Sequence, residues 1–157
     1  MSHENELFEK SGGKLLTFQL GNQEYGIQIL QAREVVGLMR IDPVPQTPSF
    51  MKGVINLRGK IIPVIDLRSK FGMPHIEPGK ENCIVVVDMH GKLTGVIVDL
   101  LVGVLTVEPD DFEHTPELGA NIHAEFITGM VKLESRIVIV LNMEMILSNE
   151  DLRQIHK

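Results

Sequence analysis

The sequence predicts a mainly β protein built from two small five-stranded barrels packed on one another, with a short C-terminal helix. Three observations support this fold class. Short β-branched runs bounded by turn residues dominate the chain. The chain also matches itself at constant offsets, so that each half offers about five strands. Finally, 49 of the 157 residues are Leu, Ile or Val and none is Trp, a composition that fills narrow cores with aliphatic side chains.

The predicted elements follow in order along the chain. Leu16, Phe18 and Leu20 alternate with polar residues, and a turn at 21–24 leads into 25–30, which predicts a β-hairpin. Helical signals are confined to a turn at 67–71, a second near 48–52, and a C-terminal helix from about Met143 with Asn142 as its N-cap. The remaining predicted strands are 34–40, 53–57, 60–66, 83–89, 92–98, 102–107, 128–133 and 137–141.

The internal match divides the chain into two related halves, at about 15–71 and 84–147. Apolar and glycine positions between 16 and 35 recur 69 residues later, and those between 50 and 66 recur 76 residues later. The change of offset indicates a seven-residue insertion in the second half, between about Val107 and Phe126. Five short strands close economically into a small barrel, which removes exposed edges. The sequence leaves open which strand closes which barrel.

The match also sets the expected organisation. We expect a polar tail at 1–13, one folding unit at 14–148, and a helix end or tail at 149–157. The one cysteine, Cys83, lies in an apolar run and is expected to be a buried thiol.

Composition argues against nucleic-acid and membrane partners. The chain carries 15 basic and 21 acidic residues, a net charge of -6, and no basic run longer than two. Non-specific nucleic-acid binding depends on Lys and Arg that neutralise phosphates, so nucleic acid is not an expected partner. The N-terminal segment is polar, and no apolar stretch is long enough to span a bilayer. We therefore expect a cytoplasmic protein without direct membrane insertion.

Catalytic patterns are absent from the sequence. The six histidines form no His-x-His or His-x-x-x-His pair and no Cys pair accompanies them, so no metal is expected. Phosphate-loop and nucleophile-elbow motifs are also missing. The best carboxylate candidates, Asp66 and Asp99, each follow an apolar strand, and the pair Asp110 and Asp111 suits the start of a helix. The sequence predicts a binding protein without cofactors rather than an enzyme.

Two alternatives from other classes remain open at this stage. A small hydrolase based on these carboxylates would need a deep polar pocket that holds two of them. A structural, self-assembling β protein would form stable homo-oligomers without any partner.

One turn carries an unexplained charge. In the segment 56–59, Asn56 and Gly59 suit a tight hairpin turn, but the turn itself does not require Arg58 at the tip. Glu34 similarly stands just before an apolar strand. Both side chains could be ordinary solvated charges, or together they could form a charged pair that marks a contact surface.

Several motifs, in order and spacing, resemble the CheW-like domain of bacterial chemotaxis. The most specific signal is Gly-Val-Ile-Asn-Leu-Arg-Gly at 53–59 followed by Pro-Val-Ile-Asp-Leu-Arg at 63–68. The other motifs are Phe-x-Leu-Gly at 18–21, Tyr-Gly-Ile-x-Ile at 25–29, Pro-x-x-Pro at 45–48 and Gly-Val-Ile-Val-Asp at 95–99. The resemblance covers about 14–148 and shows no departure within these motifs.

The resemblance implies two five-stranded SH3-like barrels that share a hydrophobic core. It further implies a non-catalytic adaptor that couples methyl-accepting chemotaxis receptors to the histidine kinase CheA and supports receptor control of autophosphorylation. One surface would bind the cytoplasmic tip of the receptor and another the regulatory domain of CheA, at receptor arrays on the inner face of the membrane. The length accommodates neither a kinase nor a receiver domain, so a stand-alone adaptor, monomeric when alone, is expected. A CheW-like scaffold in a non-chemotaxis signalling array is the alternative.

By carry-over from the family, partner binding is expected at positions in both halves. Glu34 and Arg58 would form or flank a sensitive charged pair. For the glycines, a backbone requirement explains the residue as well as direct contact does. The full set of candidate positions is Glu34, Val35, Gly53, Arg58, Gly59, Gly95, Leu101 and Val104.

Overall fold

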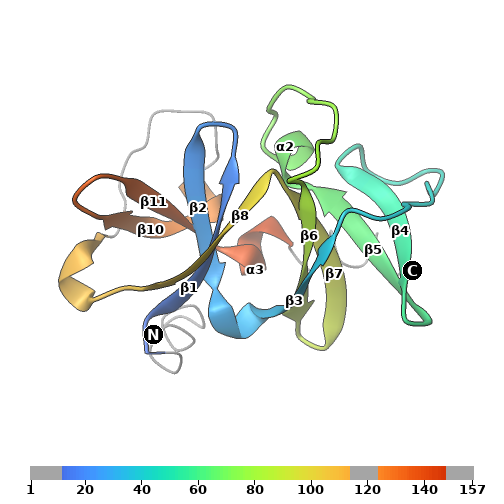
Figure 1. The fold of residues 1–157 in the computed structure, drawn as a ribbon. Coiled ribbons are helices and arrows are strands. Elements are labelled where there is room, and N and C mark those ends of the chain that lie inside the picture. The colour runs from blue at the N-terminus through green and yellow to red at the C-terminus, as the bar shows by residue number, and fades with distance from the viewer. Residues whose placement is uncertain (1–11, 114–123, 148–157) are drawn as a thin grey trace.

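The computed structural model describes residues 12–113 and 124–147. Most of the predicted tail at 1–13, the predicted helix end at 149–157 and most of the predicted insertion lie outside the described residues. Within the described residues, eleven strands form two twisted sheets that stand side by side as two lobes (Figure 1). The mainly β class is therefore confirmed.

The first sheet has six strands in the order β8-β1-β2-β11-β10-β9 and the second has five in the order β3-β6-β7-β5-β4. The strands of the first sheet are β1 (Lys14–Leu20), β2 (Gln23–Gln28), β8 (Leu100–Thr106), β9 (Phe112–Glu113), β10 (Ile127–Lys132) and β11 (Ile137–Leu141). Those of the second are β3 (Ala32–Gly37), β4 (Met51–Leu57), β5 (Lys60–Asp66), β6 (Cys83–Met89) and β7 (Lys92–Val98).

The helices are short and lie at strand ends. They are α2 (Leu67–Lys70), α3 (Met143–Ile146) and the 3-10 turns η1 (Ile29–Gln31), η2 (Pro109–Asp111) and η3 (Ala124–Phe126). The turn η2 carries Asp110 and Asp111 in its first turn, as their sequence context indicates. The helical turn predicted near 48–52 is wrong: the chain makes one hydrogen-bonded turn, from the Met51 N–H to the Pro48 carbonyl, and enters β4 at Met51.

The internal duplication is visible in the strand registers. β1 pairs with β2 with Leu16 opposite Ile27, and β6 pairs with β7 with Val85 opposite Val96, both residues 69 positions later. The ends of β5 and β11 repeat as well, because the Asp66 N–H donates to the Phe50 carbonyl and the Asn142 N–H, 76 positions on, donates to the Phe126 carbonyl. Both halves therefore follow one folding plan.

The two halves exchange strands rather than each closing a sheet alone. The hairpin β1-β2 of the first half joins β8 to β11 of the second, whereas the hairpin β6-β7 of the second half joins β3 to β5 of the first. The exchange is reciprocal: β8 pairs with β1 as β3 pairs with β6, and β11 runs parallel to β2 as β5 runs parallel to β7. Each lobe thus contains strands of both halves, which the sequence match had left open.

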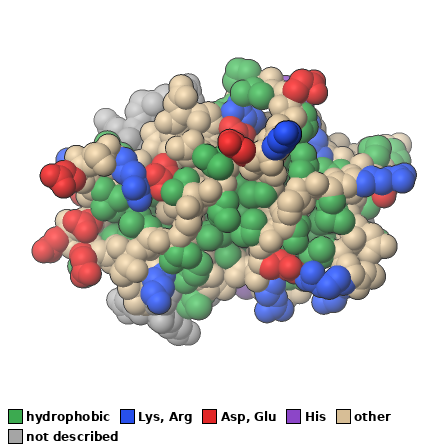
Figure 2. Space-filling model, viewed as in Figure 1, with side chains coloured by type: hydrophobic (Ala, Val, Ile, Leu, Met, Phe, Trp, Pro, Cys, Tyr) green, Lys and Arg blue, Asp and Glu red, His purple; other side chains and the backbone are tan. Residues whose placement is uncertain are grey.

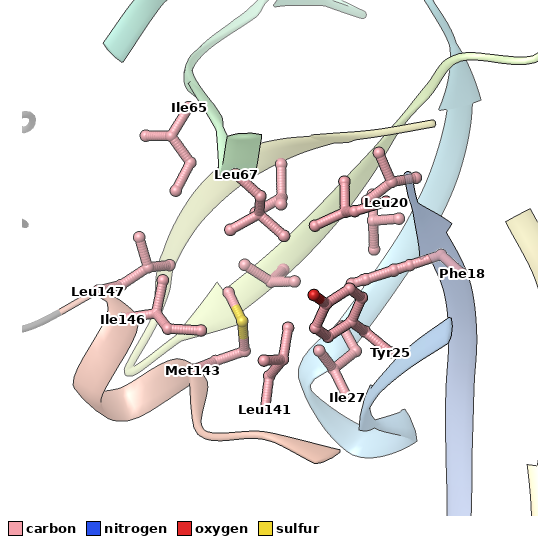
Figure 3. Close-up of a cluster of buried hydrophobic side chains, with 14 of the residues drawn as sticks. Phe18, Leu20, Tyr25, Ile27, Ile65, Leu67, Leu141, Met143, Ile146 and Leu147 are labelled. Atoms are coloured by element: carbon pink, nitrogen blue, oxygen red, sulfur yellow. The ribbon is translucent and has the colours of Figure 1, made fainter. Parts of the chain in front are cut away.

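The sheets share one large core. It lies between the lobes and takes side chains from both, including Phe18, Tyr25, Ile65 and Leu141, and from the buried face of α3. Figure 3 shows these side chains converging from the two sheets and the two helices. Two smaller clusters fill the individual sheets, one around Leu15 and Val138 and the other around Ile55 and Ile84. Burial of this shared apolar surface is what holds the lobes together as one unit.

Cys83 stands at the edge of the shared core, at the start of β6. Its side chain is buried, and this burial raises the pKa of the thiol. The expectation of a buried, unpaired cysteine is confirmed for the described residues.

Candidate functional site

The turn between β4 and β5 presents Arg58 at the end of the five-stranded sheet. Arg58 and Gly59 have φ angles of 51° and 86°, the positive values that a two-residue type I′ hairpin turn needs at both positions. The Asn56 Oδ1 accepts a hydrogen bond of 2.9 Å from the Gly59 N–H and fixes the turn. A side chain other than glycine costs roughly 1–2 kcal/mol in this conformation. The turn therefore holds an arginine at a position that glycine would fill more easily.

Arg58 reaches from this turn to Glu34 on β3. Its Nη2 donates to the Glu34 Oε1. The strands β3 and β4 are the two edge strands of the five-stranded sheet. The ion pair therefore links the two edges of the sheet to one another. The side chain of Arg58 is 69% exposed and that of Glu34 is 31% exposed. An ion pair this exposed contributes about 0–1 kcal/mol to stability.

A hollow of about 260 Å³ lies beside the pair. Its floor is apolar and its rim is charged, with Lys60 and Arg33 next to the paired side chains. Ile61, the residue after Lys60, is 64% exposed. Figure 2 shows Lys and Arg side chains gathered over this end of the five-stranded sheet. The lining residues are Arg33, Glu34, Leu57, Arg58, Lys60, Ile62 and Leu93.

Three of the candidate apolar positions lie on β3 and β8. Val35 and Leu101 are partly buried and pack against the shared core. Val104, opposite Leu16 in the pairing of β8 with β1, is 61% exposed, and Val102, two residues before it, is 44% exposed. In Figure 2 hydrophobic side chains gather in the middle of the face that β8 and β3 cross in Figure 1. The outward valines of β8 form an exposed apolar strip on that face.

Two of the candidate glycines are explained by close packing, against backbone at Gly53 and against a side chain at Gly95. Gly53 has φ 145°, and a Cβ there would lie against the Asp42 carbonyl oxygen and 2.7 Å from its carbonyl carbon. The neighbouring Val54 exchanges two backbone hydrogen bonds of 2.9 Å with Asp42. These bonds join the segment that follows β3 to β4, at the other edge of the sheet. At Gly95, a Cβ would lie 2.8 Å from the Ile84 Cγ2 inside the sheet. Both glycines are buried in the sheet.

The structure thus brings part of the predicted set together. Glu34, Arg58 and Gly59 meet at one exposed end of the five-stranded sheet, with Val35 next along β3. Leu101 and Val104 belong to the other sheet, and Gly53 and Gly95 are internal. Their roles in binding remain predictions.

A second hollow, of about 280 Å³, lies at the opposite end of the same sheet. The strand β5 runs from Lys60 at the first hollow to Asp66 at the second. Here the Arg68 Nε donates to the Asp99 Oδ1 at 2.9 Å, its Nη2 donates to the Asp99 Oδ2, and its Nη1 donates to the Pro74 carbonyl. The Gly21 N–H donates to the Asp99 Oδ2 at 2.7 Å. Sequence reasoning missed this network, because the parallel pairing that brings the ends of β5 and β7 together is not visible in the sequence.

The network sets the protonation of its members. Burial alone would raise the pKa of Asp99, but the hydrogen bonds from Arg68 and Gly21 and the charge of Arg68 hold it below its ordinary value. The hydrogen bond to Asp99 raises the pKa of Arg68. Both groups are therefore firmly ionised near neutral pH.

This hollow bears on the hydrolase alternative, because it holds both Asp66 and Asp99. That alternative also needs a polar pocket, whereas half of the twelve residues that line this hollow are apolar. Asp66 serves as the N-cap of α2, with its Oδ1 accepting from the Arg68 N–H at 3.1 Å. A general acid needs a pKa raised toward neutral, whereas the pKa of Asp99 is lowered. The two carboxylates are thus arranged for structure rather than for acid–base chemistry.

Within residues 12–113 and 124–147, no three His, Cys, Asp or Glu side chains come close enough to hold a metal ion. None of the helices in this part of the chain has the length and apolar character needed to cross a bilayer.

Comparison with known proteins places the chain in a family. A family model described as the CheW-like domain matches residues 14–151. The chain belongs to the CheW-like domain family. The resemblance seen in the motifs at 53–59, 63–68 and 95–99 is therefore confirmed.

Individual relatives extend over nearly the whole CheW-like chain. The chemotaxis protein CheW of Klebsiella aerogenes is 35% identical over 144 residues, covering 92% of this chain and 87% of the relative. The probable chemotaxis protein CheW of Rhizobium etli is 30% identical over 151 residues, covering 96% and 97%. The crystal structure of the scaffolding protein TtCheW from Thermoanaerobacter tengcongensis superposes with a TM-score of 0.79 at 33% identity, covering 88% and 89%. Names that describe chemotaxis and scaffolding are consistent with a chain that is not an enzyme.

Proposed function

We propose that this CheW-like chain is a non-catalytic adaptor that couples methyl-accepting chemotaxis receptors to the histidine kinase CheA. It would bind the cytoplasmic tip of the receptor and the regulatory domain of the kinase, so that receptor signals alter autophosphorylation. Its place would be at receptor arrays on the inner face of the cytoplasmic membrane, and it would need no cofactor.

The observation that carries the proposal is the exposed Glu34–Arg58 pair. Arg58 stands in a turn position that favours glycine, and its ion pair is too exposed to stabilise the fold by much. The backbone conformation of Arg58 is unfavourable for a residue with a side chain, and its ion pair adds little to the stability of the fold. Recognition of a partner explains why an arginine stands there. The apolar floor and charged rim of the adjacent hollow resemble the centre and rim of a small protein interface.

The apolar strip of β8 supports a second binding surface. Val102 and Val104 present two exposed aliphatic side chains at alternate positions of an edge strand. A helical hairpin such as a receptor tip can pack its apolar face against such a strip. The strip belongs to the six-stranded sheet and the charged pair to the five-stranded sheet, so one chain could hold two partners at once.

The test is reconstitution of the protein with receptor-bearing membranes and CheA, followed by measurement of kinase recruitment and autophosphorylation. The key variants are Arg58→Glu and Arg58→Gly. Arg58→Glu should lower the concentration-dependent activation of CheA at least about tenfold, equivalent to about 1.4 kcal/mol of lost binding. Arg58→Gly should lose coupling while its free energy of unfolding stays the same or rises, because glycine suits the turn.

Two controls separate recognition from folding. Lys60→Glu makes the same charge change two residues away, outside the pair, and should affect coupling less. The exchanged double variant Glu34→Arg with Arg58→Glu restores an ion pair without restoring a partner contact, so it should remain impaired. The proposal fails if the wild-type protein neither recruits CheA nor changes its rate.

A further inference from the structure

The second hollow, beside α2, has the composition of a small-molecule site. Half of its twelve lining residues are apolar, and they come from three separate segments: the chain after β3, the connection from α2 to β6, and the end of β7. Figure 1 shows the connection from α2 to β6 as a loop that stands above the sheet next to α2. The apolar lining residues are Leu38, Ile41, Pro43, Ile76, Pro78 and Ile97.

Part of this apolar wall is left exposed. Ile76 is 58% exposed and Leu38 is 37% exposed, and both side chains line the hollow. A ligand that covered both side chains would gain about 25 cal/mol for each Å² of apolar surface removed from water. The site therefore favours a ligand with an apolar body.

The charged groups at the floor are unequally satisfied. Arg68 and Asp99 neutralise one another through two hydrogen bonds, and Asp66 accepts from the Arg68 N–H and, at 3.4 Å, from the Ser69 hydroxyl. Lys52 is different, because its Nζ lies 3.9 Å from the Asp66 Oδ2, which is an ion pair but too long for a hydrogen bond. Its ammonium can therefore donate to a ligand without breaking a short contact.

A second donor stands at the rim. The His75 Nε2 lies 3.7 Å from the Glu77 Oε1 and the His75 side chain is 63% exposed, so it too is held only loosely. The two carboxylates of the site already face Arg68, Lys52 or backbone N–H groups. An incoming amine would compete with these cations, whereas an incoming carboxylate would meet the loosely held donors.

We propose that this hollow binds a small organic acid. Its carboxylate would accept hydrogen bonds from the Lys52 ammonium, with His75 as a second donor, and its apolar body would cover Leu38, Ile76 and Ile97. A closed cavity of about 150 Å³ holds one benzene ring, so a hollow of about 280 Å³ suits a monocarboxylate with one ring or a branched chain of about six to ten carbon atoms. The site lies away from the Glu34–Arg58 pair and does not depend on the adaptor proposal.

The test uses the full chain alone, without receptor or kinase. Phenylacetate, phenylacetamide and phenethylamine share one ring and differ only in the polar group. Titration followed by amide chemical shifts should show saturable one-to-one binding of phenylacetate, with the largest shifts at Lys52, Ile76 and Ile97. The amide and the amine should bind at least about fivefold more weakly, because neither carries the charge that Lys52 recognises.

Variants then assign the contacts. Lys52→Gln should weaken phenylacetate at least about fivefold and leave phenylacetamide nearly unchanged, and Ile76→Ser, an exposed position that should not disturb folding, should weaken both. Lys60→Gln, at the other end of the sheet, is the matched control and should bind phenylacetate like the wild type. The proposal is overturned if none of the three probes saturates below about 10 mM, if the amine binds more tightly than the acid, or if Lys52→Gln and Lys60→Gln behave alike.

Discussion

Two glycines of the β4–β5 hairpin are required for different structural reasons. Gly53, in β4, has the Asp42 carbonyl where a side chain would begin, and its φ of 145° suits glycine alone. Gly59, in the turn, has φ 86° but open space around the position of a Cβ. Glycine is therefore required at position 53 by both packing and backbone conformation, and at position 59 by backbone conformation only.

This difference gives a prediction for alanine at each position. Gly53→Ala should lower the free energy of unfolding by about 3 kcal/mol or more, because the Asp42 segment would have to move and its two hydrogen bonds to Val54 would be strained. Gly59→Ala should cost only about 1 kcal/mol. Urea denaturation of both variants measures the difference. Equal losses would show that the close approach at Asp42 does not constrain the strand.

A second residue-scale prediction concerns Asp99 and acid. Its pKa is lower in the folded chain than the unfolded value of about 3.9, so its contribution to stability is complete above about pH 5 and is lost as pH falls through the unfolded and then the folded pKa. Asp99→Asn should lower the free energy of unfolding at pH 7 by about 2–4 kcal/mol, because Arg68, with only 8% of its side chain exposed, loses its partner.

The same variant should also lose less stability than the wild type between pH 5 and pH 3. Denaturation curves at pH 7, 5 and 3 measure both effects. Asp42→Asn is the control, since the Arg40–Asp42 pair has side chains 88% and 55% exposed and should contribute little. If Asp99→Asn and Asp42→Asn cost the same, the Asp99 pair is not a stabilising contact.

At the scale of elements, local patterns predicted most strands but not their neighbours. The strands 60–66, 83–89 and 92–98 have the predicted bounds within one residue at either end, because alternation, β-branching and turn residues act locally. The turn near 48–52 was misjudged as helical because the tertiary contact of β4 with Asp42 and β5 decides its conformation. Pairing between distant strands depends on side chains that meet only after folding.

The candidate site shows the same division. The charge at the tip of the β4–β5 turn was visible in the sequence, and so was Glu34 before its strand, but their contact depends on the curvature of the sheet. The Arg68–Asp99 network could not be predicted, because a charged residue just after a strand is common and does not indicate its partner. Only the parallel pairing of β5 with β7 brings them to one edge.

At the scale of the whole molecule, the exchange of strands makes the two halves interdependent. Four strand pairings join the first half to the second: β1 with β8, β2 with β11, β3 with β6 and β5 with β7. The shared core likewise takes side chains from both halves. A half removed from the other would expose unpaired strand edges and much of the apolar face that it now buries.

We therefore expect that the fragments 1–79 and 80–157, cut in the exposed connection before β6, do not fold separately but assemble when mixed. Each fragment alone should lack a cooperative unfolding transition, and an equimolar mixture should regain both the β-sheet circular dichroism and the transition. Gly26→Val in the first fragment is the control. A Cβ at Gly26 would already lie 3.3 Å from the Val138 Cγ1 across the β2–β11 pairing, so the larger side chain should prevent assembly. The prediction would be wrong if either fragment, as a monomer, unfolded cooperatively by itself. One half of the chain could then fold without strands from the other, and the exchange of strands would not be what makes the chain a single folding unit.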